Sequence, residues 1–73
     1  MIRPEVILEY AILHCCAEIS AEAKTIRTCE EQGDKAGAMV HTQNRRRLDD
    51  NLADLSQLYK LTTGRSYGYC FCE

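Results

Sequence analysis

The long stretch without internal proline or glycine between Pro4 and Gly33 is the feature that most constrains the fold of this chain. A proline at the start suits the first helical turn, because its missing N–H would be unpaired there anyway. Glu5 follows where the positive end of the helix dipole favours an acid, and Gly33 is a natural stop. The sequence therefore predicts one long helix over about residues 4–32.

A second helical run follows almost directly. It starts near Asp34, a candidate N-cap, and continues to Gly64, a natural C-cap. We expect its regular part at about residues 38–63, after a link at about 33–37. Two helices joined by so short a link should lie antiparallel. The predicted fold is all-α, a helical hairpin that forms a single domain over residues 1–73.

Apolar residues on each run predict the surface between the two helices. On a helical wheel they fall on one side of each run, as in a short antiparallel coiled coil. We expect Ile19 to meet Leu52 and Cys15 to meet Leu55, and the more polar link end to pair Glu22 with Arg45 or Leu48. On the first run this line consists of Leu8, Ile12, Cys15, Ile19, Ile26 and Cys29. On the second run the matching line consists of His41, Arg45, Leu48, Leu52, Leu55 and Tyr59, and its first two members are polar.

The first run also carries a second apolar line, on nearly the opposite side. A helix that is apolar on both sides must be covered on both sides, and one partner helix cannot do this. Either another copy of the hairpin, giving a four-helix bundle or a larger oligomer, or the chain's own tail can supply the cover. The expected interface residues are Val6, Tyr10, Leu13, Ala17, Leu58, Leu61, Tyr67, Tyr69 and Phe71.

The tail at residues 64–73 alternates aromatic residues with glycine and cysteine, a period of two that predicts an extended segment. At about 3.3 Å per residue, such a segment is long enough to reach Cys15 and Cys16. These cysteines with Cys70 and Cys72 are the candidate metal ligands. Structural zinc usually takes thiolates from C-x2-C knuckles, and adjacent helical cysteines point about 100° apart. We therefore expect no metal and no cofactor.

The string from Ser66 to Cys70 resembles the start of the zinc finger of DksA/TraR-type transcription factors, where a helical hairpin precedes a G-Y-C-x-x-C knuckle. The likeness covers fewer than about ten residues. The second cysteine comes one residue early, at Cys72, and no second knuckle follows. What the resemblance implies is a zinc-stapled transcription regulator that binds polymerase, and this stays an alternative.

Composition excludes several classes of function. The content of 45% apolar and 27% charged residues is typical of a globular chain, and the net charge of -2 argues against non-specific nucleic-acid binding. No apolar stretch approaches the roughly 20 residues of a membrane span, and no signal-peptide cleavage pattern follows the first residues. We expect a cytoplasmic protein in which the five cysteines are mostly free thiols.

Two polar groups remain as candidate sites. Cys29 and His41 could form an activated nucleophile, but no residue is placed to orient the histidine, so we expect no enzyme. Arg45, Arg46 and Arg47 fan over about 200° of a helix, and acids three and four residues later favour a salt-bridged face. The alternative is a nucleotide or nucleic-acid site made across subunits by Lys24, Arg27, Arg46 and Arg47.

These features together predict a small regulatory or inhibitor protein without enzymatic activity. It would form homo-oligomers and bind a partner protein through its helix faces and aromatic tail. The size is typical of regulators carried by phages and other mobile elements.

Overall fold

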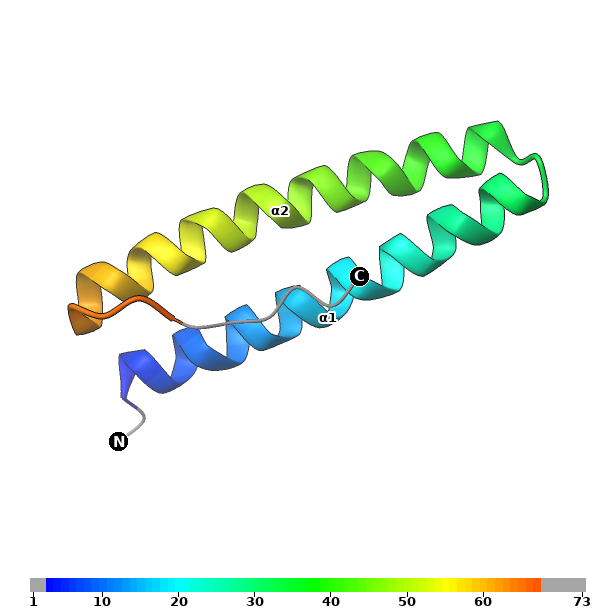
Figure 1. Cartoon of the computed structure of the whole chain (residues 1–73). Helices are drawn as coiled ribbons and strands as arrows, with labels where there is room; N and C mark the ends of the chain where they lie inside the picture. The colour runs from blue at the N-terminus through cyan, green and yellow to red at the C-terminus, as the bar shows by residue number, and fades with distance from the viewer. Residues whose placement is uncertain (1–2, 68–73) are drawn as a thin grey trace.

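The computed structural model describes residues 3–67, which form an antiparallel hairpin of two helices, α1 (Pro4–Glu31) and α2 (Lys35–Thr63). The molecule is a rod of 47 × 21 × 16 Å, so it consists of one layer of two helices (Figure 1). The predicted all-α helical hairpin is confirmed. Of the residues expected to matter, Tyr69, Cys70, Phe71 and Cys72 lie outside the described part of the chain.

The link between the helices is tighter than the sequence suggested. The N–H of Asp34 donates to the carbonyl of Cys29 over 2.8 Å, and the N–H of Gly33 donates to that of Glu30 over 3.1 Å. These two hydrogen bonds form a Schellman motif. Gly33 takes the left-handed conformation in it (φ 73°), which is strained for a residue that has a side chain. Asp34 also caps α2, since its carboxylate accepts from the N–H of Gly37 at 2.9 Å. The second helix therefore begins at Lys35 rather than near residue 38.

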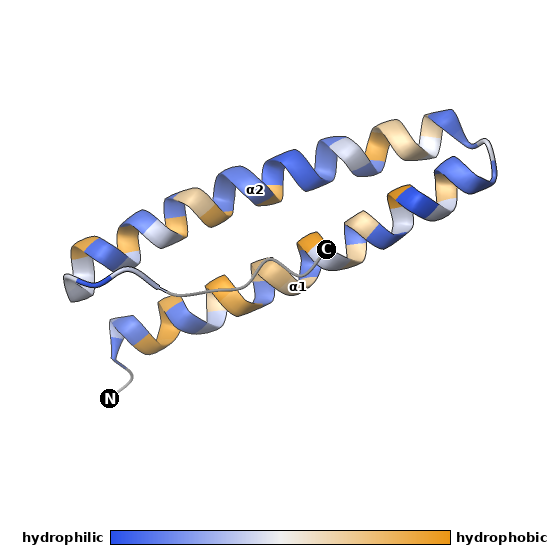
Figure 2. Cartoon of the chain, viewed as in Figure 1, coloured by the Kyte–Doolittle hydropathy of each residue, from blue (hydrophilic) through white to orange (hydrophobic). Residues whose placement is uncertain are grey.

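The core lies between the two helices and follows the predicted lines for most of their length. Its buried members are Leu8, Ile12, Cys15, Ile19, Leu52 and Tyr59, with Cys16, Leu48, Leu55 and Tyr67 packed against them. Figure 2 shows apolar residues concentrated in the first half of α1, whereas the middle of α2 is largely hydrophilic. Neither α1 nor α2 is apolar enough over its length to cross a membrane.

The pairing along the core differs from the expected register. The Cys15 thiol lies 3.2 Å from the carbonyl oxygen of Leu48, about two turns nearer the link than Leu55. The Glu22 carboxylate meets His41 at 2.7 Å, one turn nearer the link than Arg45, and it also lines a groove together with Leu48, the other expected neighbour. Both shifts have the same direction, because the link is shorter and α2 starts earlier than predicted.

Residues 64–67 turn back from the end of α2 across the ends of both helices. Gly64 ends α2 in the left-handed conformation (φ 74°), as predicted for a C-cap. The Tyr67 ring then packs edge-on against Tyr59, with ring centroids 5.3 Å apart. The Arg65 guanidinium reaches Glu5 at 3.4 Å, an exposed pair of small energetic value. The first described residues of the tail thus pack against their own hairpin.

Replacing Tyr67 by alanine should lower the free energy of unfolding by about 1 kcal/mol, because an edge-on aromatic pair contributes roughly that beyond its area. Tyr10→Ala is the matched control, since Tyr10 is 71% exposed. Urea denaturation followed by circular dichroism measures both variants. Equal effects of the two substitutions would contradict a structural role for the Tyr59–Tyr67 contact.

Candidate interaction surface

Large apolar side chains are exposed at the end of the hairpin where α1 begins and α2 ends. Here Ile7, Tyr10 and Leu13 of α1 are 54–71% exposed, and Leu58 and Leu61 of α2 are 49% and 76% exposed. We call these five residues the open-end surface. Soluble proteins rarely leave so many large apolar side chains uncovered at one end, and such patches commonly mark binding sites.

The predicted interface and the open-end surface agree in part. Tyr10, Leu13, Leu58 and Leu61 are exposed as expected, whereas Val6 is half-buried. Ile7 was missed because it lies between the two apolar lines of α1 on the helical wheel, not on either of them. Its 55% exposure makes it a full member of the surface. At the link end, Met39 and Val40 are also more than half exposed.

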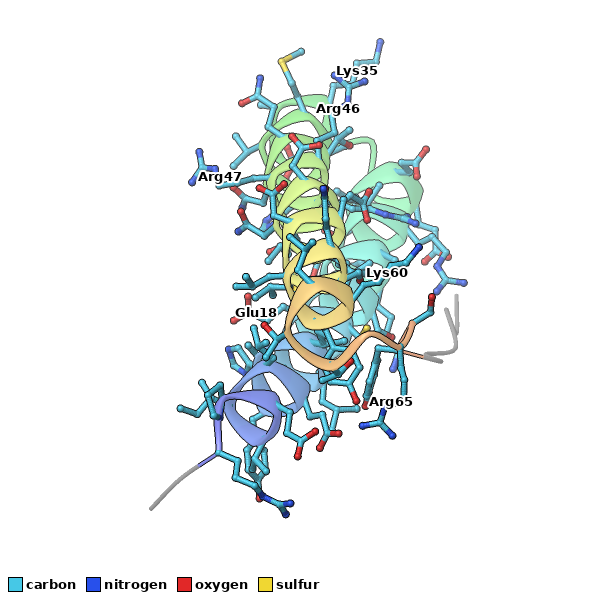
Figure 3. The ribbon with its side chains drawn as sticks, turned by 90° about the vertical axis from the view of Figure 1, so that its left-hand side faces the viewer. Glu18, Lys35, Arg46, Arg47, Lys60 and Arg65 are labelled. Carbon is cyan, nitrogen blue, oxygen red and sulfur yellow. The ribbon has the colours of Figure 1, made fainter. Side chains whose placement is uncertain are left out.

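The two sides of the hairpin differ. Tyr67 packs against one side, whereas the other side carries a shallow groove between the helices, lined by Glu18, Glu22, Asn44, Arg47 and Leu48. Figure 3 shows Glu18 and Arg47 on one side and residues 64–67 on the other.

Two apolar residues nearer the open end of the hairpin lie on the same side as this groove. Ile7 comes eleven residues before Glu18, and Leu58 comes eleven residues after Arg47. Eleven residues make about three helical turns, which returns a side chain to the same side of its helix. Ile7, Glu18, Arg47 and Leu58 therefore share one side, which we call the open groove face.

Polar pairs connect the two helices beside this groove. His41 Nδ1 lies 2.7 Å from Glu22 Oε2, and both side chains are largely shielded from solvent. On α1 itself, His14 Nε2 lies 3.0 Å from Glu18 Oε1, an exposed pair one turn apart. His41 is thus paired with a carboxylate. The Cys29 thiol lies instead beside Gly37, where a Cβ added to the glycine would come within 3.1 Å of the sulfur.

The helix cysteines are free thiols with different surroundings. Cys15 and Cys29 are buried and Cys16 is half-buried. Burial, and then the neighbouring Cys16, Glu18 and Asp49, raise the pKa of the Cys15 thiol above its ordinary value. Burial also raises the pKa of Cys16. Thiolates bind metals and attack electrophiles, so these environments favour the inert form.

No group of three histidine, cysteine or acidic side chains suited to holding a metal ion occurs within residues 3–67. Cys15 and Cys16 are two of the candidate ligands from the sequence, and the other two, Cys70 and Cys72, lie beyond that part. The described part of the chain therefore contains only two of the four candidate zinc ligands.

Stability should fall as the pH rises above about 9, because three groups have a raised pKa in the folded chain. Burial raises the pKa of Tyr59 above its ordinary 10.0, and its hydrogen bond to Glu9 adds to the effect. The two thiols shift upward from 9.0. The folded chain then holds its protons longer than the unfolded chain, so stability is complete below the unfolded values and is lost above them.

Urea denaturation at neutral pH and again above about pH 10 measures this loss. A Tyr59→Phe variant should lose less stability over the same step, since one of the three titrating groups is gone. A loss as large as that of the parent chain would rule out a contribution from Tyr59.

The candidate anion-binding residues are divided between the two helices. Arg46 and Arg47 are neighbours on α2 and point in different directions, as Figure 3 shows. Lys24 and Arg27 are exposed on α1. An anion site made from these four side chains across subunits stays a prediction.

Searches of protein-family models, curated proteins and solved structures found no match to this chain.

Proposed function

We propose that this chain is a small binding protein without enzymatic activity, which acts by docking its open-end surface on another polypeptide. The observation that carries the proposal is the 49–76% exposure of five large apolar side chains at one end of a two-helix rod. Water contact with this surface is costly, at about 25 cal/mol per Å² of apolar area, so covering it would drive association. A regulatory or inhibitory role in the cytoplasm fits a small chain that acts by binding another polypeptide.

The residue types of this surface support a protein partner. Tyrosine is enriched in protein interfaces, and a few well-packed aromatic and aliphatic anchors usually dominate binding. Tyr10 combines 71% exposure with a rigid ring and a polar tip. Leu13 is the next large apolar residue on the same side of α1. These two side chains are the expected anchors.

The test is co-purification from the source cells with a tagged chain. A Tyr10→Ser/Leu13→Ser double variant should lose a stoichiometric partner that the parent chain retains. Met39→Ser/Val40→Ser is the matched control, because it removes similarly exposed apolar groups from the link end. Recovery of the same proteins by the parent chain and by both variants would overturn the proposal.

A further inference from the structure

We infer that a second copy of the chain covers the open groove face, forming a two-fold symmetric four-helix bundle. The inference deepens the proposed function, since it names the polypeptide that takes up the Ile7 and Leu58 part of the open-end surface. In this dimer the two-fold axis runs along the hairpin, between two stacked layers. The α1 helix of each copy then lies over α2 of the other copy, antiparallel to it.

Residues 3–67 form a single layer of two helices. Domains are generally built from at least two packed layers, and this rod is only 16 Å deep. The accessible surface is 5486 Å² for a chain of 8.3 kDa, whereas a compact protein of that mass exposes about 4,600 Å². The excess of about 900 Å² is close to the roughly 800 Å² that each partner buries in a stable interface.

The register of the hairpin determines which residues would meet. Within one chain, Glu22 pairs with His41 and Tyr59 with Glu9, which fixes the residues of α1 and α2 that lie at the same height. These two pairs place Leu58 within about one turn of the height of Ile7, and the lining of the groove places Glu18 beside Arg47. The axis along the hairpin preserves height, so the same pairs face each other between the copies.

The pairs that result are complementary in chemistry. At the open end, the half-exposed Ile7 of one copy packs against Leu58 of the other. In the middle, the Glu18 carboxylate of one copy faces the Arg47 guanidinium of the other. Each pair occurs twice by symmetry. Opposite charges at matched positions give a dimer both its register and its specificity.

The alternative two-fold axis, across the hairpin, gives a worse match. It would reverse the height of the second copy and place the apolar Ile7–Leu58 end against the link end of the groove. There the lining is Asn44 and Glu22, whose carboxylate is already paired with His41, so apolar side chains would cover polar groups and gain no new charge pair. The open groove face is therefore self-complementary in one arrangement only.

Charge reversal tests this arrangement. In sedimentation equilibrium with reductant present, the parent chain should dimerise at micromolar concentration. Glu18→Arg and Arg47→Glu should each weaken the dimer about tenfold or more, because each places two pairs of like charges together. The double variant should restore the parent dissociation constant to within about threefold. Arg46→Glu is the matched control and should leave it unchanged, since Arg46 points away from this face (Figure 3).

A hydrophobic substitution provides an independent measurement. Leu58→Lys should weaken the dimer by about a hundredfold, whereas Leu61→Lys on the outer side of α2 should not. Circular dichroism checks that each variant remains helical. A monomer at all concentrations would overturn the inference, and so would a dimer that ignores these charge changes but dissociates with Tyr10→Ser/Leu13→Ser.

The two proposals fail separately. A chain that stays monomeric but still co-purifies with a foreign protein through Tyr10 and Leu13 leaves the proposed function intact and removes the dimer. The opposite result is a dimer with the expected charge dependence, whose Tyr10→Ser/Leu13→Ser variant keeps every bound protein. It would support the dimer and overturn the proposed function.

Discussion

Replacing Leu52 by alanine should destabilise the hairpin by about 3 kcal/mol, the middle of the range for a buried leucine. Leu52 is 2% exposed and, with Ile12, is one of the two most completely buried large side chains of the described core. A chain of this length has a total stability of only about 4–11 kcal/mol, because so little surface is buried. The substitution therefore removes a large share of the total and should lower the melting temperature by more than about 12 °C.

Leu61→Ala is the matched control for Leu52→Ala. It makes the same chemical change on the same helix, but Leu61 is 76% exposed. Its effect should stay within about 0.5 kcal/mol. Thermal and urea denaturation at one fixed protein concentration compare the two variants. A small loss at Leu52, similar to that at Leu61, would mean that the α1–α2 seam is not the stabilising core.

The sequence predicted the fold well because local signals agree with the global pattern. Pro4 and Gly64 mark the outer ends of the helices, and Gly33 marks the link, each for a backbone reason that does not depend on tertiary contacts. The period of the apolar residues then assigns the inner face of each helix. Six of the eight buried apolar residues of the described chain belong to the core cluster between the helices.

The register could not be predicted, because it depends on the geometry of the link. A link centred two residues later would have paired Cys15 with Leu55, but the Schellman turn at Gly33 leads directly into the cap at Asp34. The link is then shorter, and the facing residues move toward it. Propensities indicate that a turn occurs there, but they do not fix which of several turn geometries the chain adopts.

One residue of the predicted seam was wrong. Ile26 was expected in the seam but is only half-buried, whereas Ala23 is 6% exposed. Near the link, the side chain that lies against Gly37 of α2 is that of Cys29.

The candidate surface was predicted in kind and only partly in position. Two apolar lines on α1 required cover on two sides, and the structure leaves Tyr10 and Leu13 exposed. The open groove face could not be read from the sequence in the same way. Its definition needs both the register, which places Glu18 beside Arg47, and the side on which Tyr67 packs. Both are properties of the tertiary structure, which the pattern of residues along the chain does not give.

Gly37→Ala should destabilise the chain by about 2 kcal/mol, although alanine is the better helix former by roughly 1 kcal/mol. A Cβ at Gly37 would collide with the Asp34 carboxylate, 2.9 Å from its Cγ, and would lie 3.1 Å from the Cys29 sulfur. The carboxylate cannot move away without losing its hydrogen bond to the Gly37 N–H, which caps α2. Loss of such a cap typically costs about 1 kcal/mol. Close packing at the link thus reverses the usual sign of the substitution.

A double-mutant cycle separates the collision from the cap. Asp34→Ala alone should cost about 1 kcal/mol, because it removes the cap and leaves Gly37 in place. In that background the main obstacle to a Cβ is gone, so adding Gly37→Ala should cost much less than it does in the parent chain, or even stabilise the helix. Urea denaturation of the four chains gives the coupling between the two positions. Additive effects would show that Gly37 matters for some reason other than its approach to Asp34, and that α2 does not depend on this contact to begin at Lys35.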